Sequence, residues 1–297
     1  MTPIEFIAAH DVRNALARAT AAYKGPIDHH WYEPAWNIPL QKIADLIEAG
    51  ETELSRVVDR FRGTSLVDGD GGMPPKRNVF DDRGHEALWF GTRIRMKNTL
   101  MVHLKRALVN AVLYDACCVD TESVVELGSG DGLNLFEFWL AASPRRARYM
   151  AFEIASTGRL CTELLAALEP RIRMSAHAFD YYSPCYDAIP DGQKHMLVFT
   201  IMSIEQIAKL PKAAIEGLLE KADAVSGVHW EPVAWQLPEH DNPVHKRGCF
   251  ERGYNQNLWS ILTELQHEGR ISIDRVAVDL YGRTYHPTSL IQWHKIR

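Results

Sequence analysis

An α/β fold built on a mostly parallel sheet is predicted for this chain of 297 residues, and three observations predict it. From residue 96 onward, short apolar segments of strand length are separated by segments with helical periodicity. The first strand runs directly into a turn with three glycines, and the last two strands are joined by a turn that holds Gly282 and Pro287. Strands that alternate with helices are typical of a parallel sheet with helices on both faces.

The individual elements follow from periodicity and composition. Apolar residues three and four apart predict helix over 40–61 with a break near Gly50, and a leucine repeat of period four predicts helix over 96–115. From Gly63 to Gly84 the chain is rich in Gly, Asp and Pro, which predicts a loop. The sequence does not decide whether this loop closes over a ligand. Further helices are expected around 215–219 and 258–265, and strands at 123–127, 148–153, 171–177, 194–200, 224–229, 271–280 and 288–293.

The stretch Ser-Val-Val-Glu-Leu-Gly-Ser-Gly-Asp-Gly at 123–132 is the most informative part of the chain. Its alternate glycines suit a strand-to-helix turn in which missing Cβ atoms let backbone N–H groups approach a ligand closely. Glu126 ends the strand, so a carboxylate faces the ligand. The dinucleotide fingerprint G-x-G-x-x-G is excluded because position 133 is Leu. A turn that merely joins a strand to a helix is the structural alternative.

The pattern E-x-G-x-G-x-G, from Glu126 to Gly132, resembles motif I of the class I S-adenosylmethionine-dependent methyltransferases. The resemblance covers roughly residues 96–297 and implies S-adenosyl-L-methionine as the cofactor. It also implies a seven-stranded, mostly parallel sheet with an antiparallel last strand and helices on both faces, preceded by a helical and loop extension over 1–95 that covers the substrate. The cofactor-binding residues that it implies in this loop are Glu126, Gly128, Ser129, Gly130 and Gly132.

Later strand ends fit the same resemblance. Glu153 ends the second strand about 20 residues after Gly132, where a carboxylate can accept both ribose hydroxyl protons. Phe179 and Asp180 follow the third strand and resemble the adenine-binding stretch of the family, with Asp180 accepting from the exocyclic amine. Thr200, at the end of the fourth strand, completes the cofactor contacts that the resemblance implies.

Acidic residues and a histidine follow the fourth and fifth strands, within Thr200–Gln206 and His229–Pro232. Ligands of open α/β sheets bind beyond the carboxyl ends of the strands, so the reacting centre is expected there. Methyl transfer relies on positioning, and a base is needed only when the acceptor keeps its proton. The candidates for a base or an orienting group are Glu205, His229 and Glu231. Each has a structural alternative. Glu205 can complement a helix dipole, His229 can be a hydrogen-bonded histidine of the core, and Glu231 can be an acid with a purely structural role.

The acceptor is left as a small metabolite, a sugar or a peptide, methylated on nitrogen or oxygen. The Asn-Pro-Pro-Tyr type signature for nucleobase and amide nitrogen targets is absent after the fourth strand. The run Ser-Ile-Glu-Gln-Ile at 203–207 and the closing hairpin resemble bacterial methyltransferases of secondary metabolism, including sugar O-methylating and peptide-modifying ones, which implies natural product biosynthesis. Two alternatives stay open: a catalytically inactive, cofactor-binding partner subunit, and a protein or arginine N-methyltransferase in which Glu205 and Glu231 hold a guanidinium.

The N-terminal segment is rich in aromatic and histidine residues: Tyr23, His29, His30, Trp31, Tyr32 and Trp36. In the resembling family such segments fold over the site and select the substrate, and the alternative is that they anchor an N-terminal helix to the body. No metal is expected at His29 and His30, because adjacent residues rarely point at one ion, and the same reasoning applies to His240 and His245.

Composition bounds the partners and the compartment. The net charge of −5 disfavours a nucleic-acid partner, and the five cysteines lack a paired metal spacing and fit a reducing compartment. The first thirty residues lack a basic segment followed by an apolar core, and no apolar run approaches the ~18 residues of a membrane span. We therefore expect a cytoplasmic enzyme that does not contact a membrane, with a homodimer as one option for its assembly.

Overall fold

The computed structural model describes residues 1–10, 12, 29–64, 84–141, 144–240, 242–283 and 286–296. The chain divides into two compact units, one formed by Met1–Asp81 with Ser129–Ala178 and the other by Asp82–Gly128 with Phe179–Arg297. The expected division at residue 95 therefore differs from these units, each of which is built from two segments. The predicted loop from Gly63 to Gly84 falls almost wholly outside the described residues, as does Tyr23.

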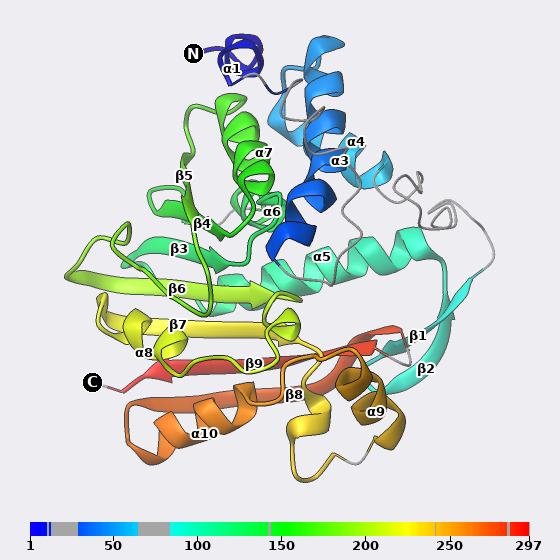
Figure 1. Ribbon diagram of the computed structural model, residues 1–297, viewed down its shortest axis with the longest axis vertical. Helices are drawn as coiled ribbons and strands as arrows, with labels where there is room; N and C mark the ends of the chain where they lie inside the picture. Colours follow the sequence, from blue (N-terminus) through cyan, green and yellow to red (C-terminus); the bar gives the residue numbers. More distant parts are fainter. Residues whose placement is uncertain are drawn as a thin grey trace. The chain divides into compact units, whose positions relative to one another are not determined.

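The first unit contains helices and two parallel strands (Figure 1). In β4 and β5 the register runs from Arg148 opposite Arg173 to Glu153 opposite Ala178. The helix predicted over 40–61 is present as two helices, because Gly50 adopts φ +94° between them. The bounds of the elements are α1 Pro3–Ala9, α3 His29–Glu48, α4 Leu54–Thr64, α6 Leu133–Leu140, β4 Arg148–Glu153, α7 Ser156–Ala167 and β5 Arg173–Ala178.

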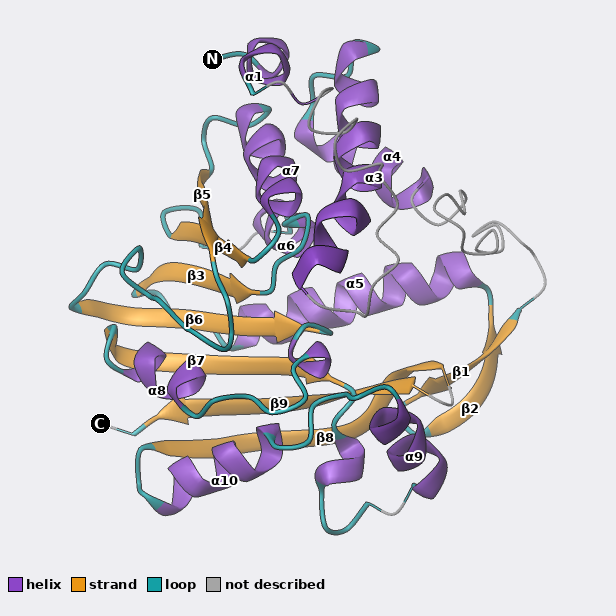
Figure 2. Ribbon diagram, in the orientation of Figure 1, coloured by secondary structure: helices purple, strands orange, loops and turns teal. Residues whose placement is uncertain are grey.

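The second unit is a mixed sheet with helices packed on it, in the strand order β2-β1-β8-β9-β7-β6-β3 (Figure 2). The strands β3, β6 and β7 are parallel, and β9 lies antiparallel between β7 and β8, which confirms the predicted antiparallel last strand. Its strands are β1 His85–Trp89, β2 Thr92–Met96, β3 Thr121–Leu127, β6 Gln193–Ile201, β7 Ala222–Glu231, β8 Ile271–Arg283 and β9 His286–Lys295. Its helices are α5 Asn98–Asp115, η1 Ile204–Gln206, α8 Ala213–Leu219, η2 Ala234–Gln236, α9 Pro243–Glu251 and α10 Leu258–His267.

The α/β fold is confirmed, but the described residues form nine strands where seven were expected. The additional pair is the hairpin of β1 and β2, which lies in a segment predicted as helix and loop. Its two-residue turn uses Phe90 at φ +50° and Gly91 at φ +73°, the pair of positive values that a type I′ turn requires. Only Gly91 signals this turn in the sequence, and strands of five residues are too short to show a clear period.

The strands at the centre of the second unit are closely packed. All residues of β6 except Lys194 are buried, as expected for a central parallel strand covered on both faces. Within β7, a Cβ atom at Gly227 would overlap the indole of Trp293, so this glycine lets a large ring of β9 pack against the backbone of β7.

No described helix is long and apolar enough to cross a membrane.

Candidate functional site

The glycine loop has the same unusual backbone at each of its three glycines. Gly128, Gly130 and Gly132 adopt φ values of +65°, +57° and +75°, in the left-handed region that L side chains rarely occupy. Gly132 is the N-cap of α6, so the loop passes straight from β3 into a helix N-terminus. The predicted strand-to-helix turn is therefore present, and its glycines are required by conformation.

In the first unit, Glu153 holds this loop. Its Oε2 accepts from the N–H of Gly130 at 2.8 Å and its Oε1 accepts from the N–H of Ala155 at 2.9 Å. The carboxylate is 4% exposed, and burial raises its pKa although both hydrogen bonds act to lower it. The residue expected to grip ribose thus already has one backbone donor on each oxygen, and each oxygen keeps a further lone pair.

Helix α3 lies against the same loop. The Cα of Gly130 faces the indole of Trp36 so closely that an added Cβ would lie 2.5 Å from two ring carbons. Glu33 accepts from the backbone N–H groups of Ser156 at 2.6 Å and Thr157 at 3.2 Å, at the start of α7, which has no side-chain cap of its own. Helix α3 is therefore anchored to α7, and Trp36 covers one side of Gly130.

Two polar groups at the loop are buried without a hydrogen-bond partner among the described residues, Oγ of Ser129 and Nε1 of Trp36. Both polar atoms of the amide of Asn37, the next residue of α3, are also buried without one. Ser129 and Asn37 are each 4% exposed. Buried polar groups in native proteins are nearly always hydrogen-bonded, so this group is suited to a polar ligand.

In the second unit, Gly128 faces Ser203. An added Cβ would lie 2.5 Å from the Ser203 Cβ, so the absence of a side chain lets the loop after β6 approach β3. Oγ of Ser203 donates to the carbonyl of Leu127 at 2.9 Å and lies 2.8 Å from the hydroxyl of Tyr181. The three residues tie the ends of β3 and β6 to the segment after β5.

The other predicted cofactor residues of the second unit are buried or engaged locally. Glu126 is fully buried at the end of β3. The Phe179 ring lies 5.0 Å from Tyr181 and 5.6 Å from Tyr186, between ring centroids. Oδ1 of Asp180 accepts from the N–H of Tyr182 at 2.9 Å, which closes a turn. Their contacts with a cofactor stay predictions.

Glu231 grips the loop that carries Glu205. Met202 adopts φ +53° after β6, and the three following N–H groups, of Ser203, Ile204 and Glu205, donate to the Glu231 carboxylate at 3.1 to 3.2 Å. Burial, and then the neighbouring Glu205 carboxylate, raise the pKa of Glu231 to about 8. Glu231 is fully buried, so its contacts favour a framework part in positioning Glu205.

His229 is held from both sides. Its Nε2 accepts from the Trp293 indole at 2.9 Å, which leaves Nδ1 as the protonated nitrogen, 3.0 Å from Oγ1 of Thr200. Burial lowers the pKa of His229 to about 3, so the ring is neutral. Both nitrogens are engaged, and the arrangement favours an orienting part for His229 over proton transfer. Thr200, predicted to contact the cofactor, is fully buried beside it.

Glu205 differs from Glu231 because one of its oxygens has no hydrogen-bond donor among the described residues. Its Oε1 accepts from the Gln206 amide at 2.8 Å, whereas Oε2 lies 3.0 Å from Nε2 of His286 without hydrogen-bond direction. Asn255 holds the same loop from the other side, since its N–H donates to the carbonyl of Glu205 at 2.9 Å. The Tyr254 ring lies 5.4 Å from the His286 ring. The structure thus pairs a predicted acid with a histidine that sequence reasoning missed.

A second carboxylate and histidine pair lies in the same unit. Nε2 of His240 is 3.1 Å from Oδ2 of Asp279. His245 is fully buried, and neither of its ring nitrogens has a hydrogen-bond partner among the described residues. Burial first, then the charges of His286 and His240, lower the pKa of His245 to about 4, so the ring is neutral at pH 7.

The residues that the sequence did not predict had weak signals. Asp279 interrupts an apolar strand, which marks a polar side chain in a buried position. His286 is the first residue of β9, directly before Pro287, and its approach to Glu205 depends on the pairing of β8 with β9. The sequence signal for Trp36 is its place in the aromatic N-terminal segment. The side chains of residues 29–31 in that segment lie outside the described residues.

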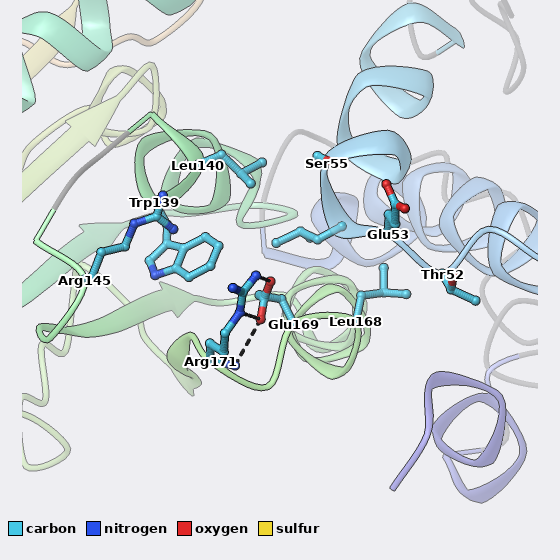
Figure 3. A pocket seen from close by; sticks show the side chains of 10 residues that line it. Thr52, Glu53, Ser55, Trp139, Leu140, Arg145, Leu168, Glu169 and Arg171 are labelled. Atoms are coloured by element: carbon cyan, nitrogen blue, oxygen red, sulfur yellow. Dashed lines mark hydrogen bonds and ion pairs between the residues drawn. The ribbon is translucent and has the colours of Figure 1, made fainter.

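A cavity of about 640 Å³ opens elsewhere, within the first unit (Figure 3). The Arg145 guanidinium lies 4.0 Å from the Trp139 ring, and Arg171 donates twice to Glu169, at 2.7 and 2.5 Å. The guanidinium groups of Arg145 and Arg171 are balanced by the carboxylates of Glu53 and Glu169. The lining therefore favours neither an anionic nor a cationic ligand. The residues that line it are Thr52, Glu53, Leu54, Ser55, Trp139, Leu140, Arg145, Leu168, Glu169 and Arg171, and they include none of the predicted site residues.

No protein-family model matches the chain, and no curated protein matches its sequence. Among solved structures, it is similar to magnesium protoporphyrin IX methyltransferase from Synechocystis with bound S-adenosylhomocysteine, at 11% identity and a TM-score of 0.46, over 81% of this chain and 99% of that one. It is similar to geranyl diphosphate C-methyltransferase from Streptomyces coelicolor, at 10% identity and 0.46, over 67% and 83%. It is also similar to the plantazolicin methyltransferase, at 11% and 0.43, over 66% and 84%. At these identities the function has to be argued from the residues of this chain.

Proposed function

We propose that the chain is an S-adenosyl-L-methionine-dependent N- or O-methyltransferase that acts on a small metabolite, a sugar or a peptide, in bacterial secondary metabolism. The observation that carries the proposal is the glycine loop. The motif from Glu126 to Gly132 adopts left-handed backbone at each glycine, between a buried strand and a helix N-terminus. This is the geometry that brings backbone N–H groups close to a ligand.

The residues around the loop fit this cofactor. The Ser129 hydroxyl, the Trp36 indole N–H and the Asn37 amide offer buried donors and acceptors with no partner among the described residues. Glu153 keeps lone pairs for the ribose hydroxyls while it fixes the loop. The cofactor, when bound, supplies an electrophilic methyl group on a sulfonium. The further contacts that we propose are Glu126, Gly128, Gly130, Gly132, Phe179, Asp180 and Thr200.

The pair of Glu205 and His286 is our candidate for the proton that an acceptor hydroxyl or N–H group releases. A carboxylate 3.0 Å from the imidazole stabilises the imidazolium that forms when the ring takes this proton. The His286 side chain is 19% exposed and Glu205 is 7% exposed, so the imidazole is the member that an acceptor can reach. We assign His286 as the base and Glu205 as the group that stabilises it.

The two other predicted catalytic residues act one step further from the acceptor. Glu231 fixes the backbone of residues 203–205 through three N–H groups. His229 fixes the hydroxyl of Thr200. Both are positioning residues in this proposal, and their loss is expected to displace Glu205 and Thr200.

The contacts of Glu231 argue against an arginine N-methyltransferase. A guanidinium held between two carboxylates needs free oxygens on both, in a bidentate geometry. Oε1 of Glu231 already accepts two backbone N–H groups, Oε2 accepts a third, and the residue is fully buried, so Glu231 is poorly suited to a bidentate guanidinium. The alternative of an inactive partner subunit predicts cofactor binding without transfer, which an assay separates from the main proposal.

The test is transfer of a labelled methyl group from S-adenosylmethionine to a panel of sugars, phenols and short peptides. We expect His286→Gln and Glu205→Gln to lower turnover by about 10²- to 10⁴-fold, the range of a general base, while affinity for S-adenosylhomocysteine stays within about threefold. His294→Gln is the matched control, because His294 also lies on β9 and pairs with a carboxylate, Asp274, at 2.8 Å on the exposed surface.

Three outcomes separate the alternatives. Loss of turnover in both site variants but not in His294→Gln supports the assignment. Equal turnover in all variants contradicts the assigned base. Tight binding of S-adenosylhomocysteine with no transfer to any acceptor of the panel supports the inactive partner subunit.

A further inference from the structure

The segment 254–257, which joins α9 to α10, is hydrogen-bonded to the loop that carries Glu205. The N–H of Asn255 donates to the carbonyl of Glu205 at 2.9 Å. Further along the loop, the Asn257 amide bonds to both backbone groups of Leu210: Oδ1 accepts from the N–H and Nδ2 donates to the carbonyl, each at 2.8 Å. The loop has little regular structure of its own, so this segment acts as its second strand of support.

Asn255 carries this support into the protein core. Its side chain is buried, and Nδ2 donates to the carbonyl of Ile207 at 2.7 Å. Oδ1 accepts from the N–H of Asn257 at 3.1 Å and from the N–H of Leu258 at 2.8 Å, at the start of α10. One buried amide therefore fixes the loop of Glu205 to the N-terminal end of a helix.

The residue before Asn255 contacts the other member of the carboxylate and histidine pair. The ring centroid of Tyr254 lies 5.4 Å from that of His286, with the two planes at 54°. Ring pairs at such distances favour particular orientations. Two consecutive residues thus hold the two members of the pair: Tyr254 contacts the imidazole, and Asn255 holds the backbone of Glu205.

The pair depends on such support because it is not joined directly. Oε2 of Glu205 and Nε2 of His286 are 3.0 Å apart but lack hydrogen-bond direction. Their relative placement is set by the backbone and the neighbouring side chains. The backbone of Glu205 is held at both polar groups, since its N–H donates to Glu231 at 3.2 Å and its carbonyl accepts from Asn255. A base has to lie within hydrogen-bond reach of the proton that it takes, so small displacements of the pair are costly.

Tyr254 is not suited to be the base itself. Its side chain is half-buried, and burial, followed by the charge of Glu205, raises the pKa of its hydroxyl above the ordinary value. The phenol therefore keeps its proton at neutral pH. What Tyr254 offers to the pair is the contact of its ring.

We infer that Tyr254 and Asn255 are positioning residues for the proposed methyl transfer. The Tyr254 ring sets the orientation of the His286 imidazole, and Asn255 fixes the backbone of Glu205 beside it. This inference rests on the proposed function and names the residues that hold its base in place. Both residues act through the pair and not on the acceptor, so their loss lowers kcat while KM for the acceptor stays unchanged.

The first test replaces the ring of Tyr254 in the full chain, with the acceptor that the wild type methylates fastest among sugars, phenols and short peptides. We expect Tyr254→Leu to lower kcat about three- to tenfold, the effect of a lost ring contact, with KM within about twofold. Tyr254→Phe keeps the ring and should restore kcat to within about twofold. Tyr114→Leu is the control, because Tyr114 is exposed on α5. The stoichiometry of S-adenosylhomocysteine binding, measured by calorimetry, corrects each kcat for any misfolded fraction.

The second test removes one donor from the buried amide. Asn255→Asp keeps the acceptor oxygen but loses the donor to the carbonyl of Ile207, so we expect kcat to fall about tenfold. Asn257→Asp is the matched control, with the same change of charge in the same segment. It loses a donor to Leu210, five residues after Glu205, and should lower kcat less than about threefold. Circular dichroism of both variants establishes that they fold.

The pH dependence separates positioning of a base from general structural damage. As the pH rises from 7 to 9, a growing fraction of the acceptor loses its proton without the base. The ratio of wild-type to variant kcat should therefore fall for Tyr254→Leu and Asn255→Asp. Structural damage would lower kcat by the same factor at each pH.

Each outcome decides for or against the inference. A loss of kcat in Tyr254→Leu and Asn255→Asp that shrinks with rising pH, and that Tyr254→Phe repairs, supports it. Wild-type kcat in both variants, equal losses in Tyr254→Leu and Tyr254→Phe, or a ratio that is constant with pH overturns it while the proposed function stands. Full turnover in His286→Gln, or no transfer by the wild type, removes the base itself and overturns both.

Discussion

In each unit of the molecule, a carboxylate at the end of a strand accepts hydrogen bonds from the backbone of a loop. The two loops differ in the carboxylate oxygens that remain without a hydrogen-bond donor. In the first unit Glu153 accepts from two N–H groups, one of them in the glycine loop. In the second, Glu231 accepts from three N–H groups of residues 203–205. The second loop also carries Glu205, a carboxylate whose Oε2 has no hydrogen-bond donor among the described residues.

This difference separates framework acids from chemically available ones. Glu153 and Glu231 end β4 and β7, and Glu205 lies in η1 shortly after β6. All three are buried, so burial alone does not distinguish them. The distinguishing feature is the number of donors around each carboxylate, because an unsatisfied buried oxygen is costly unless a ligand or a proton transfer uses it. The following changes test this distinction, from the largest expected effect to the smallest.

The pH dependence of stability should report Glu231. Its pKa is raised from 4.5 to about 8 in the folded chain, so between these values the unfolded chain binds fewer protons and stability falls as pH rises. The slope is at most about 1.4 kcal/mol per pH unit, which gives several kcal/mol in all. Urea unfolding at pH 5 to 8 should show this loss in the wild type and not in Glu231→Gln. Parallel curves for the two proteins would contradict the assignment.

Glu153→Gln should cost about 2 to 3 kcal/mol of unfolding free energy, because the new amide nitrogen faces an N–H donor of Gly130 or Ala155. Glu205→Gln should cost less than about 1 kcal/mol, since its Oε2 has no hydrogen bond to lose. Urea denaturation of both variants at one pH measures the difference. Equal costs would remove the distinction between a framework acid and an available one.

Gly130→Ala should lower stability by more than the cost of its left-handed backbone. That cost is about 1 to 2 kcal/mol, and Gly192→Ala measures it alone, because Gly192 has φ +67° and open space around its Cα. The added Cβ at position 130 also meets Trp36, so we expect roughly 1 kcal/mol more. In a Trp36→Ala background this excess should vanish. If it persists, the contact of Trp36 with the loop is not what makes glycine necessary there.

Glu33→Gln should have the smallest effect, about 0.5 kcal/mol, because this acid caps α7 near solvent. Although burial alone would raise it, the hydrogen bonds from Ser156 and Thr157 lower the pKa of Glu33. Its contribution is therefore present above pH 4.5 and is lost as pH falls below that value. Thermal unfolding at pH 7 and pH 3 should differ between wild type and variant only at pH 7.

Local pattern was enough to predict most strands and the glycine loop. The strand ending at Glu153, the buried strand before Thr200 and the helix over 96–115 are all present within a few residues of their predicted bounds. Each of these signals lies within one element, where a period of 2 or 3.6 or a glycine turn can be read directly.

Long-range pairing accounts for what the sequence did not reveal. His286 approaches Glu205 only through the register of β8 and β9, and Asp279 is aimed by an irregularity in that register. The hairpin of β1 and β2 was missed because its strands have five residues each and its turn begins with Phe90. The distinction between Glu205 and Glu231 depends on hydrogen-bond donors from the loop that follows Met202. The spacing of residues in the sequence does not reveal these donors.

The central claim is that the glycine loop serves S-adenosyl-L-methionine, and calorimetric titration of the full chain with S-adenosylhomocysteine tests it most directly. We predict micromolar affinity, at least tenfold weaker binding in Ser129→Ala combined with Asn37→Ala, and no binding of ATP, because the Glu153 carboxylate beside Gly130 disfavours a phosphate. Absence of heat from S-adenosylhomocysteine with a folded wild-type chain, or equal affinity for ATP, would contradict the claim.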